Sequence, residues 1–241
     1  MEIKIVKNYE EMSKAAAEAV KEVVNQSEAP LLGLATGSTP VGLYKELIAM
    51  NQNNEIDFAK TRTINLDEYI GLEGSHPQSY RYFMNETFFN HINIDKKNTH
   101  VPSGTTSNQE QECLDYEKLM TELGQVDVQI LGIGSNGHIG FNEPANKLSL
   151  VTHVTPLADS TVSANARFFE NKEEVPKTAI TMGIGSILRA KKIILLASGA
   201  NKAEIMKGIK DEFISTHIPA SLVKLHPNVL VIMDEDAASL L

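Results

Sequence analysis

The sequence of 241 residues contains a single cysteine, Cys113. One cysteine excludes an internal disulfide framework and a thiolate-rich metal site. Basic residues are also scarce, because 22 lysines and arginines face 31 aspartates and glutamates, for a formal net charge of −9. A chain of this charge lacks the basic surface that binds nucleic-acid phosphates. We therefore expect no disulfides and no nucleic-acid partner.

Long hydrophobic runs are missing as well. No apolar run approaches the ~18 residues that a membrane span needs. The first residues, Met1–Val6, resemble a strand rather than the basic and apolar start of a signal peptide. These absences predict a cytoplasmic protein without a membrane partner, but composition alone names no activity.

Apolar, strand-like runs alternate with helical patterns along the chain. The expected strands are Ile3–Val6, Leu31–Ala35, Thr61–Leu66, Val126–Ile133, Val151–Thr155, Lys192–Ala197 and Val229–Met233. The expected helices are the apolar stripe from Tyr9 to Val23, Pro40–Met50, Gln78–Ile92, Ser107–Leu123, Lys202–Ile209 and Ala220–Leu225. This alternation predicts one α/β domain over residues 1–241, built as a three-layer, doubly wound, mostly parallel and Rossmann-like sheet. Within it, the irregular stretch 142–168 is a candidate mobile lid.

The loop Thr36–Pro40 follows an expected strand, and ligands of open α/β sheets bind beyond the carboxyl ends of the strands. Gly37 lets a ligand approach the backbone, the helix that follows offers free N–H groups to an anion, and Ser38 and Thr39 add hydroxyls. The loop fits either a phosphate cradle or an ordinary strand–turn–helix connection. It lacks the Gly-Lys-Ser/Thr ending of a nucleotide P-loop, which disfavours ATP.

Two adjacent carboxylates, Asp67 and Glu68, follow the strand Thr61–Leu66. Each fits either a cap of a loop or helix or a catalytic carboxylate. Neighbouring side chains on extended backbone point to opposite sides, so we do not expect these two to form a carboxylate dyad.

A glycine-dense loop, 132–144, follows the strand that ends near Leu131. Its opening matches G-x-G-x-x-G, but it lies late in the chain and a following helix is disfavoured, so we reject a dinucleotide site. His138 lies in this loop with Asn136 two residues before it and Glu143 five residues after it. Histidine titrates near neutrality and a nearby carboxylate orients it, which favours a site over an ordinary surface histidine.

Two basic residues are candidate anion ligands. Lys202 opens a helix after Lys192–Ala197, where a cation opposes the helix dipole unless an anion is bound, and Arg167 lies near the end of the candidate lid. The remaining histidines show no metal-binding spacing, so we expect no metal. Cys113 has acidic neighbours that disfavour a thiolate nucleophile.

Together these loops resemble the glucosamine-6-phosphate deaminase family, over nearly the whole chain. The segments that carry the resemblance are Thr36–Pro40, Asn65–Tyr69, His76–Tyr80, Gly137–Pro144, Asn165–Phe169 and Lys202-Ala203. The resemblance implies conversion of glucosamine 6-phosphate to fructose 6-phosphate and ammonia in amino-sugar catabolism, a hydrolase-type deamination coupled to aldose–ketose isomerisation, with no cofactor.

The resemblance also implies roles for single residues. His138 would open the sugar ring, with Glu143 and Asn136 tuning it, and Asp67 would be the base that moves a proton between carbons 2 and 1. The phosphate would bind Gly37, Ser38 and Thr39, with charge-assisted bonds from Arg167 and Lys202.

Two features depart from the family pattern. Asn136 stands where many members carry aspartate. An amide can still accept a hydrogen bond from the imidazole but brings no charge, so we expect Glu143 to supply the charge beside His138 and the pKa of His138 to be lower than in the aspartate enzymes. His153 and Thr155 stand where hexameric members have the arginine and lysine of an allosteric site, and the chain ends at Leu241 without their C-terminal extension. We expect no activation by N-acetylglucosamine 6-phosphate, and a monomer or small oligomer rather than an allosteric hexamer.

Two alternatives stay open at this point. A 6-phosphogluconolactonase-like hydrolase shares the fold and a related Gly-His loop, although Phe141–Pro144 and Leu66–Tyr69 favour the deaminase. A sugar-phosphate-sensing effector domain of a bacterial regulator is the alternative from a different class; His138 and Asp67 together favour turnover.

Overall fold

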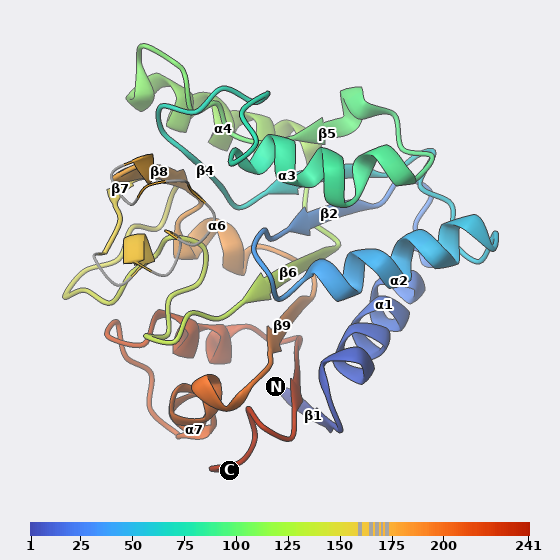
Figure 1. The fold of residues 1–241 in the computed structure, drawn as a ribbon, viewed down its shortest axis with the longest axis vertical. Coiled ribbons are helices and arrows are strands. Elements are labelled where there is room, and N and C mark those ends of the chain that lie inside the picture. Colours follow the sequence, from blue (N-terminus) through green and yellow to red (C-terminus); the bar gives the residue numbers. More distant parts are fainter. Residues whose placement is uncertain (159–160, 164–165, 167–168, 170, 172–173) are drawn as a thin grey trace.

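A central sheet of seven parallel strands organises the molecule (Figure 1). The computed structural model describes residues 1–158, 161–163, 166, 169, 171 and 174–241. In spatial order the strands are β1 (Glu2–Val6), β10 (Val229–Asp234), β9 (Ile193–Ala197), β6 (Val128–Gly132), β2 (Leu31–Leu34), β3 (Arg62–Asn65) and β5 (Thr99–His100). All six pairings are parallel. The predicted α/β, Rossmann-like class is confirmed.

The strand order reverses between β2 and β6. From β2 the chain continues outward to β3 and β5, whereas from β6 it continues the other way to β9 and β10. A crevice forms at such a reversal, beyond the carboxyl ends of the two strands, and it is the usual ligand site of an open α/β sheet. Leu32 pairs with Val128 in the shared register, so the loops that follow β2 and β6 leave the sheet side by side.

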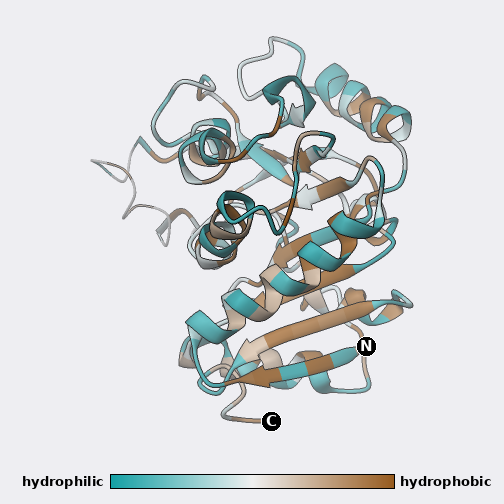
Figure 2. Ribbon diagram, turned by 90° about the vertical axis from the view of Figure 1, so that its right-hand side faces the viewer, coloured by the Kyte–Doolittle hydropathy of each residue, from teal (hydrophilic) through white to brown (hydrophobic). Residues whose placement is uncertain are grey.

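Burial explains why the central strands carry continuous apolar runs. Every residue of β2 and β9 is buried, as expected for strands covered on both faces. Figure 2 shows largely brown strands within the sheet and helices that alternate teal and brown along the ribbon. One cluster of buried side chains extends from Met12 to Ala237.

Six α-helices accompany the strands in the described residues. They are α1 (Tyr9–Gln26), α2 (Val41–Gln52), α3 (Tyr80–Thr87), α4 (Gln109–Leu123), α6 (Ile184–Leu188) and α7 (Ala203–Lys210). Short 3₁₀ helices are η1 (Phe89–His91), η2 (Lys96–Asn98), η5 (Ala200–Lys202) and η6 (Pro219–Leu225). Asn8, Ser79 and Asn108 cap α1, α3 and α4 with their side-chain oxygens. None of these helices is long and apolar enough to cross a membrane.

A second, antiparallel sheet of three strands was not expected. It consists of β4 (Asp67–Tyr69), β8 (Thr178–Thr181) and β7 (His153–Pro156), in that order. The expected strand at Val151–Thr155 exists with shifted bounds but belongs to this sheet, and 67–69 and 178–181 were not predicted. Leu66 links the two sheets, because its N–H donates to Leu34 O and its carbonyl accepts from the Met182 N–H.

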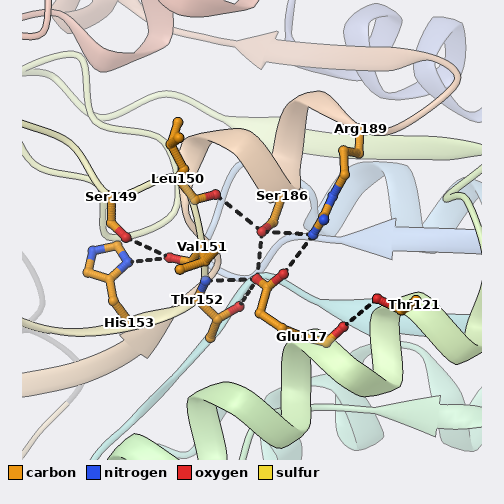
Figure 3. A network of polar contacts seen from close by, with 9 residues as sticks. All are labelled: Glu117, Thr121, Ser149, Leu150, Val151, Thr152, His153, Ser186 and Arg189. Atoms are coloured by element: carbon orange, nitrogen blue, oxygen red, sulfur yellow. Dashed lines mark hydrogen bonds and ion pairs between the residues drawn. The ribbon is translucent and has the colours of Figure 1, made fainter.

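A half-buried carboxylate anchors the chain just before β7 (Figure 3). Glu117 of α4 accepts hydrogen bonds from the Thr152 N–H and hydroxyl, both at 2.7 Å, and from the Ser186 hydroxyl at 2.6 Å. Arg189 lies 2.7 Å from its other oxygen. Burial raises the pKa of Glu117, but these hydrogen bonds outweigh burial and hold it below its ordinary value. The candidate lid 142–168 is thereby fixed at Thr152 to α4 and α6.

Candidate active site

The β2–α2 loop presents its backbone at the strand reversal. Gly37 has φ +92°, a left-handed conformation that favours glycine, and a side chain there would meet no neighbour within 4 Å. Thr39 faces the loop after β6, since a Cβ added at Gly132 would lie 3.8 Å from the Thr39 Cβ. The structure therefore brings the candidate phosphate loop beside the glycine-dense loop.

Asp67 lies at the junction of the two sheets and is only 5% exposed. Burial raises the pKa of Asp67 to about 8, and the negative charge of Glu68 adds to the shift. The described residues contribute no cation within ion-pairing distance of this carboxylate. A buried carboxyl group with a pKa near neutrality is suited to accept and return a proton.

The neighbouring Glu68 has a different role. Its carboxylate accepts hydrogen bonds from the N–H groups of Tyr69, Tyr80 and Arg81, at 2.8 to 2.9 Å, and so caps the start of α3. Asp67 instead faces the glycine-dense loop, because a Cβ at Gly140 would lie 3.4 Å from its Oδ2. The prediction that the two carboxylates form no dyad is confirmed.

An aromatic cluster packs beside Asp67. The rings of Tyr69 and Tyr80 lie 4.7 Å apart, and Phe141 stacks on Tyr80 at 6.0 Å between centroids. Burial raises the pKa of Tyr80 well above its ordinary range, and the charges of Tyr69 and Asp67 raise it further, whereas a hydrogen bond with Thr36 lowers it. Tyr80 thus connects the β2–α2 loop to Asp67. The sequence showed it only as part of a motif, without a role.

His138 pairs with Glu143 across the glycine-dense loop. The imidazole Nδ1 lies 3.3 Å from Glu143 Oε2, within ion-pairing distance but without the alignment of a regular hydrogen bond. Glu143 also accepts hydrogen bonds from Asn136 Nδ2, at 2.7 Å, and from the Thr161 hydroxyl. Burial raises the pKa of Glu143, but the contacts with His138, Thr161 and Asn136 outweigh burial and lower it overall.

Asn136 bonds the backbone and Glu143, not the imidazole. Its amide oxygen accepts the backbone N–H of His138 at 3.2 Å instead of a bond from the imidazole, while its amide nitrogen donates to Glu143. The short loop explains the difference, because a side chain two residues before His138 reaches the backbone more readily than the ring. Asn136 therefore acts on Glu143 and on the loop.

Gly134 was not among the predicted site residues, yet the position of the His138 imidazole depends on the absence of a side chain there. A Cβ at this position would lie 2.4 to 2.6 Å from three atoms of the His138 ring, closer than atoms can approach. The density of glycines around His138 was the available signal, but which glycine the ring lies against depends on the folded loop.

Two further contacts fasten this loop to the small sheet. The Phe141 N–H donates to the Thr181 hydroxyl at 3.1 Å, and Asn142 Nδ2 donates to Met182 O at 2.8 Å. Thr181 belongs to β8, which pairs with Asp67. Asp67 and the His138 loop are thus held together by the sheet that the sequence did not predict.

Of the two predicted anion-binding cations, the structure describes Lys202 only. Lys202 is the N-cap of α7, following β9 at the same edge of the sheet as His138, as expected. Arg167 lies outside the described residues. Among those that are described, no group of three or more His, Cys, Asp and Glu side chains is placed to hold a metal ion. Burial raises the pKa of Cys113, and Glu112 and Glu117 add to the shift, so a thiolate is disfavoured there.

A hollow of about 310 Å³ adjoins Glu143. Its lining includes Phe141, Glu143, Lys147, His153 and Thr155. A larger hollow of about 360 Å³ lies at the amino ends of β9 and β10, beside Met1, on the opposite edge from these acid–base groups. The hollow beside Glu143 is therefore the one that bears on the site.

Comparison with known proteins identifies the family. A family model described as glucosamine-6-phosphate isomerases/6-phosphogluconolactonase matches residues 7–232. The chain belongs to this family. A glucosamine-6-phosphate deaminase from Clostridium perfringens (strain 13 / Type A) is 55% identical over 241 residues, the whole of both chains. The deaminase from Thermoanaerobacter pseudethanolicus is 55% identical over this whole chain and 95% of its own.

Solved structures of the glucosamine-6-phosphate isomerase/6-phosphogluconolactonase family agree with the fold. One, described as a monomeric glucosamine-6-phosphate deaminase, matches with a TM-score of 0.97 and 44% identity over the whole of both chains. A 6-phosphogluconolactonase from Thermotoga maritima matches with a TM-score of 0.77 at 19% identity, over 97% of this chain and 99% of its own. The second likeness shows a shared fold alone.

Proposed function

We propose that the protein converts D-glucosamine 6-phosphate and water to D-fructose 6-phosphate and ammonia, in amino-sugar catabolism. Full-length identity of 55% with glucosamine-6-phosphate deaminases carries the proposal. The site geometry supports it, because ring opening and isomerisation each need an acid–base group and the structure holds two in different environments. The reaction balances without a redox or electrophilic cofactor.

Ring opening is assigned to the His138 side. A group there takes the proton of the anomeric hydroxyl and returns one to the ring oxygen. Glu143 is held ionised by its contacts and lies 3.3 Å from the imidazole, so it stabilises the protonated ring between these two steps. Asn136 and Thr161 fix the orientation of Glu143.

Isomerisation is assigned to Asp67. The proton on carbon 2 must move to carbon 1 before ammonia leaves, and one positioned carboxylate is able to carry it. With its pKa raised to about 8, the ionised carboxylate of Asp67 is a stronger base than an ordinary aspartate. It takes the proton from carbon 2 and keeps it until it delivers it to carbon 1. The gain from such a base is typically about 10²–10⁴-fold in rate.

The phosphate group is assigned to the β2–α2 loop. Gly37, Ser38 and Thr39 offer backbone and hydroxyl donors at the start of α2, and Lys202 follows β9, two strands from β2 at the same edge of the sheet. Arg167 stays a proposed second cation on the strength of the family resemblance. The net charge of −9 does not oppose this assignment, because local charge decides anion binding.

The decisive experiment measures ammonia released from glucosamine 6-phosphate, with lactone hydrolysis measured in parallel on 6-phosphogluconolactone. We expect ammonia release and no lactone hydrolysis. Lactone hydrolysis without ammonia would favour the 6-phosphogluconolactonase alternative. Sugar-phosphate binding without turnover of either substrate would favour a sensing domain.

Regulation and assembly are part of the proposal. We expect hyperbolic kinetics without activation by N-acetylglucosamine 6-phosphate, because His153 and Thr155 replace the basic pair of hexameric members. We also expect a cytoplasmic monomer or small oligomer, consistent with the 44% identical deaminase described as monomeric. Rate curves with and without the acetylated sugar, together with sedimentation, test both. A sigmoidal curve that the sugar abolishes would contradict the first.

A further inference from the structure

The hydroxyl of Tyr9 lies against the outer side of the β2–α2 loop. Tyr9 is the first residue of α1, 29 positions before Ser38. Its hydroxyl donates to the carbonyl oxygens of Ser38, at 3.0 Å, and Thr39, at 3.1 Å, and accepts the N–H of Gly42 at 2.7 Å. One hydroxyl thus contacts the backbone of Ser38, Thr39 and Gly42, at the end of the loop and the start of α2.

This contact supplies a cap that the local sequence lacks. Pro40 is the N-cap of α2 and makes no side-chain capping bond, so the N–H of Gly42 in the first turn has no local acceptor. Tyr9 provides the acceptor from another helix. Gly42 permits the approach, because a Cβ there would lie 2.9 Å from the Tyr9 ring and 2.1 Å from Ser13 Oγ.

The same contact sets the direction of a backbone donor. All described peptide bonds are trans, so the N–H of Thr39 points opposite to the carbonyl of Ser38. Tyr9 holds that carbonyl on the α1 side, and the Thr39 N–H is therefore directed away from α1. The next peptide ends in Pro40 and carries no N–H, which leaves the Thr39 amide as the donor whose direction Tyr9 controls.

We infer that Tyr9 is a positioning residue for phosphate recognition, which orients the Ser38–Thr39 backbone without contacting the substrate. This inference rests on the proposed assignment of the substrate phosphate to the β2–α2 loop. It adds a residue from α1 to a site otherwise built from loops at the strand ends.

The test replaces Tyr9 by phenylalanine, which removes the hydroxyl and keeps the ring. The variant loses the hydrogen bonds of the Tyr9 hydroxyl to the phosphate loop, and the acid–base groups keep their contacts. We therefore expect KM for glucosamine 6-phosphate to rise about 3- to 10-fold with kcat within about twofold. Competitive inhibition by inorganic phosphate should weaken by the same factor, since the phosphate alone reports on the loop. Tyr82→Phe, on a half-buried tyrosine of α3, is the matched control and should change neither quantity.

The possible results distinguish a failure of the Tyr9 inference from a failure of the proposed function. Wild-type protein without ammonia release would overturn the proposed function, whatever Tyr9 does. An active wild type whose Tyr9→Phe variant melts at a lower temperature but keeps KM and phosphate inhibition would overturn the positioning role. Gly42→Ala, whose Cβ overlaps Ser13 and the Tyr9 ring and so pushes α1 and Tyr9 away from the loop, provides a second variant with the same expected KM shift. An unchanged KM in a folded Gly42→Ala variant would also contradict the inference.

Discussion

The two halves of the candidate site shift the pKa of a carboxyl group in opposite directions. On one half, Asp67 lies in a buried junction between sheets, and burial raises its pKa to about 8. On the other half, Glu143 is surrounded by His138, Asn136 and Thr161, which lower its pKa despite burial. Both residues lie near the same strand reversal and both follow apolar strands in sequence. The surroundings alone make Asp67 a stronger base than an ordinary aspartate and favour the ionised form of Glu143.

This contrast assigns different chemistry to each half. A base that must take a carbon-bound proton needs a pKa high enough to hold it, whereas a charge that stabilises an imidazolium must stay ionised throughout. Hydrogen-bond donors make the difference, because two side chains donate to Glu143, whereas no described residue donates to the Asp67 carboxyl group. Four substitutions test the contrast.

The largest effect is expected for Asp67→Asn. Removing the base should lower ammonia release by about 10²–10⁴-fold. The folded-state pKa of Asp67 is raised, so the wild type loses stability as pH rises from about 4 to about 8, and the amide does not. The variant should therefore melt higher than wild type at pH 8 and equally at pH 4. Undiminished ammonia release would refute the assignment of the base.

Glu143→Gln should show the reverse dependence on pH. Its folded-state pKa is lowered, so the carboxylate contributes stability above pH ~4 that is lost as pH falls through the lowered value. The variant should melt below wild type at pH 7, with the gap closing in acid, and kcat should fall by about 10–10²-fold because the imidazolium loses its partner. Thermal melts and rates across pH check both. A gap that widens in acid would contradict the ionised state.

Gly134→Ala tests whether the imidazole needs the space beside it. The new Cβ overlaps the ring of His138, so the ring must move and we expect kcat to fall by about tenfold or more. Gly132→Ala, in the same loop, is the control, because its Cβ would meet Thr39 at an ordinary 3.8 Å. Equal activity of the two variants would show that ring position is not critical.

The smallest effect is expected for Asn136→Asp. This change sets a second carboxylate against Glu143, where the amide now donates at 2.7 Å. Like-charge repulsion favours protonation of the pair, so the acid limb of the pH–rate profile should shift by about one unit or less, with the maximal rate within a few-fold. Superimposable acid limbs would show that Glu143 and position 136 are not coupled.

Parts of this arrangement were predictable from the sequence. The apolar runs of β2, β6 and β9 are buried on both faces, so their hydrophobicity reports their environment directly. The motifs around Gly37, Asp67 and His138 follow strand ends, and the parallel topology places such loops at one edge. The strands 67–69 and 178–181 were not predictable in this way, because they are short and pair across more than 100 residues.

The contacts of single side chains were less predictable than the loops that carry them. Asn136 is able to bond the imidazole but accepts the backbone N–H of His138 instead. Thr161 and Tyr9 gave no signal, because each reaches the site from an element distant in sequence. Glu68 and Asp67 are neighbours of the same chemical class, and only their partners distinguish a cap from a candidate base.

The sequence by itself determined the α/β class, the succession of buried strands, and the loops in which chemistry is placed, because burial and turns leave periodic and compositional patterns. The tertiary structure decided the antiparallel sheet that joins Asp67 to the His138 loop, the opposite pKa shifts of Asp67 and Glu143, and the contact of Tyr9 with the β2–α2 loop. A pKa and a hydrogen-bond partner depend on which groups meet in space, and those meetings exist only once the chain has folded.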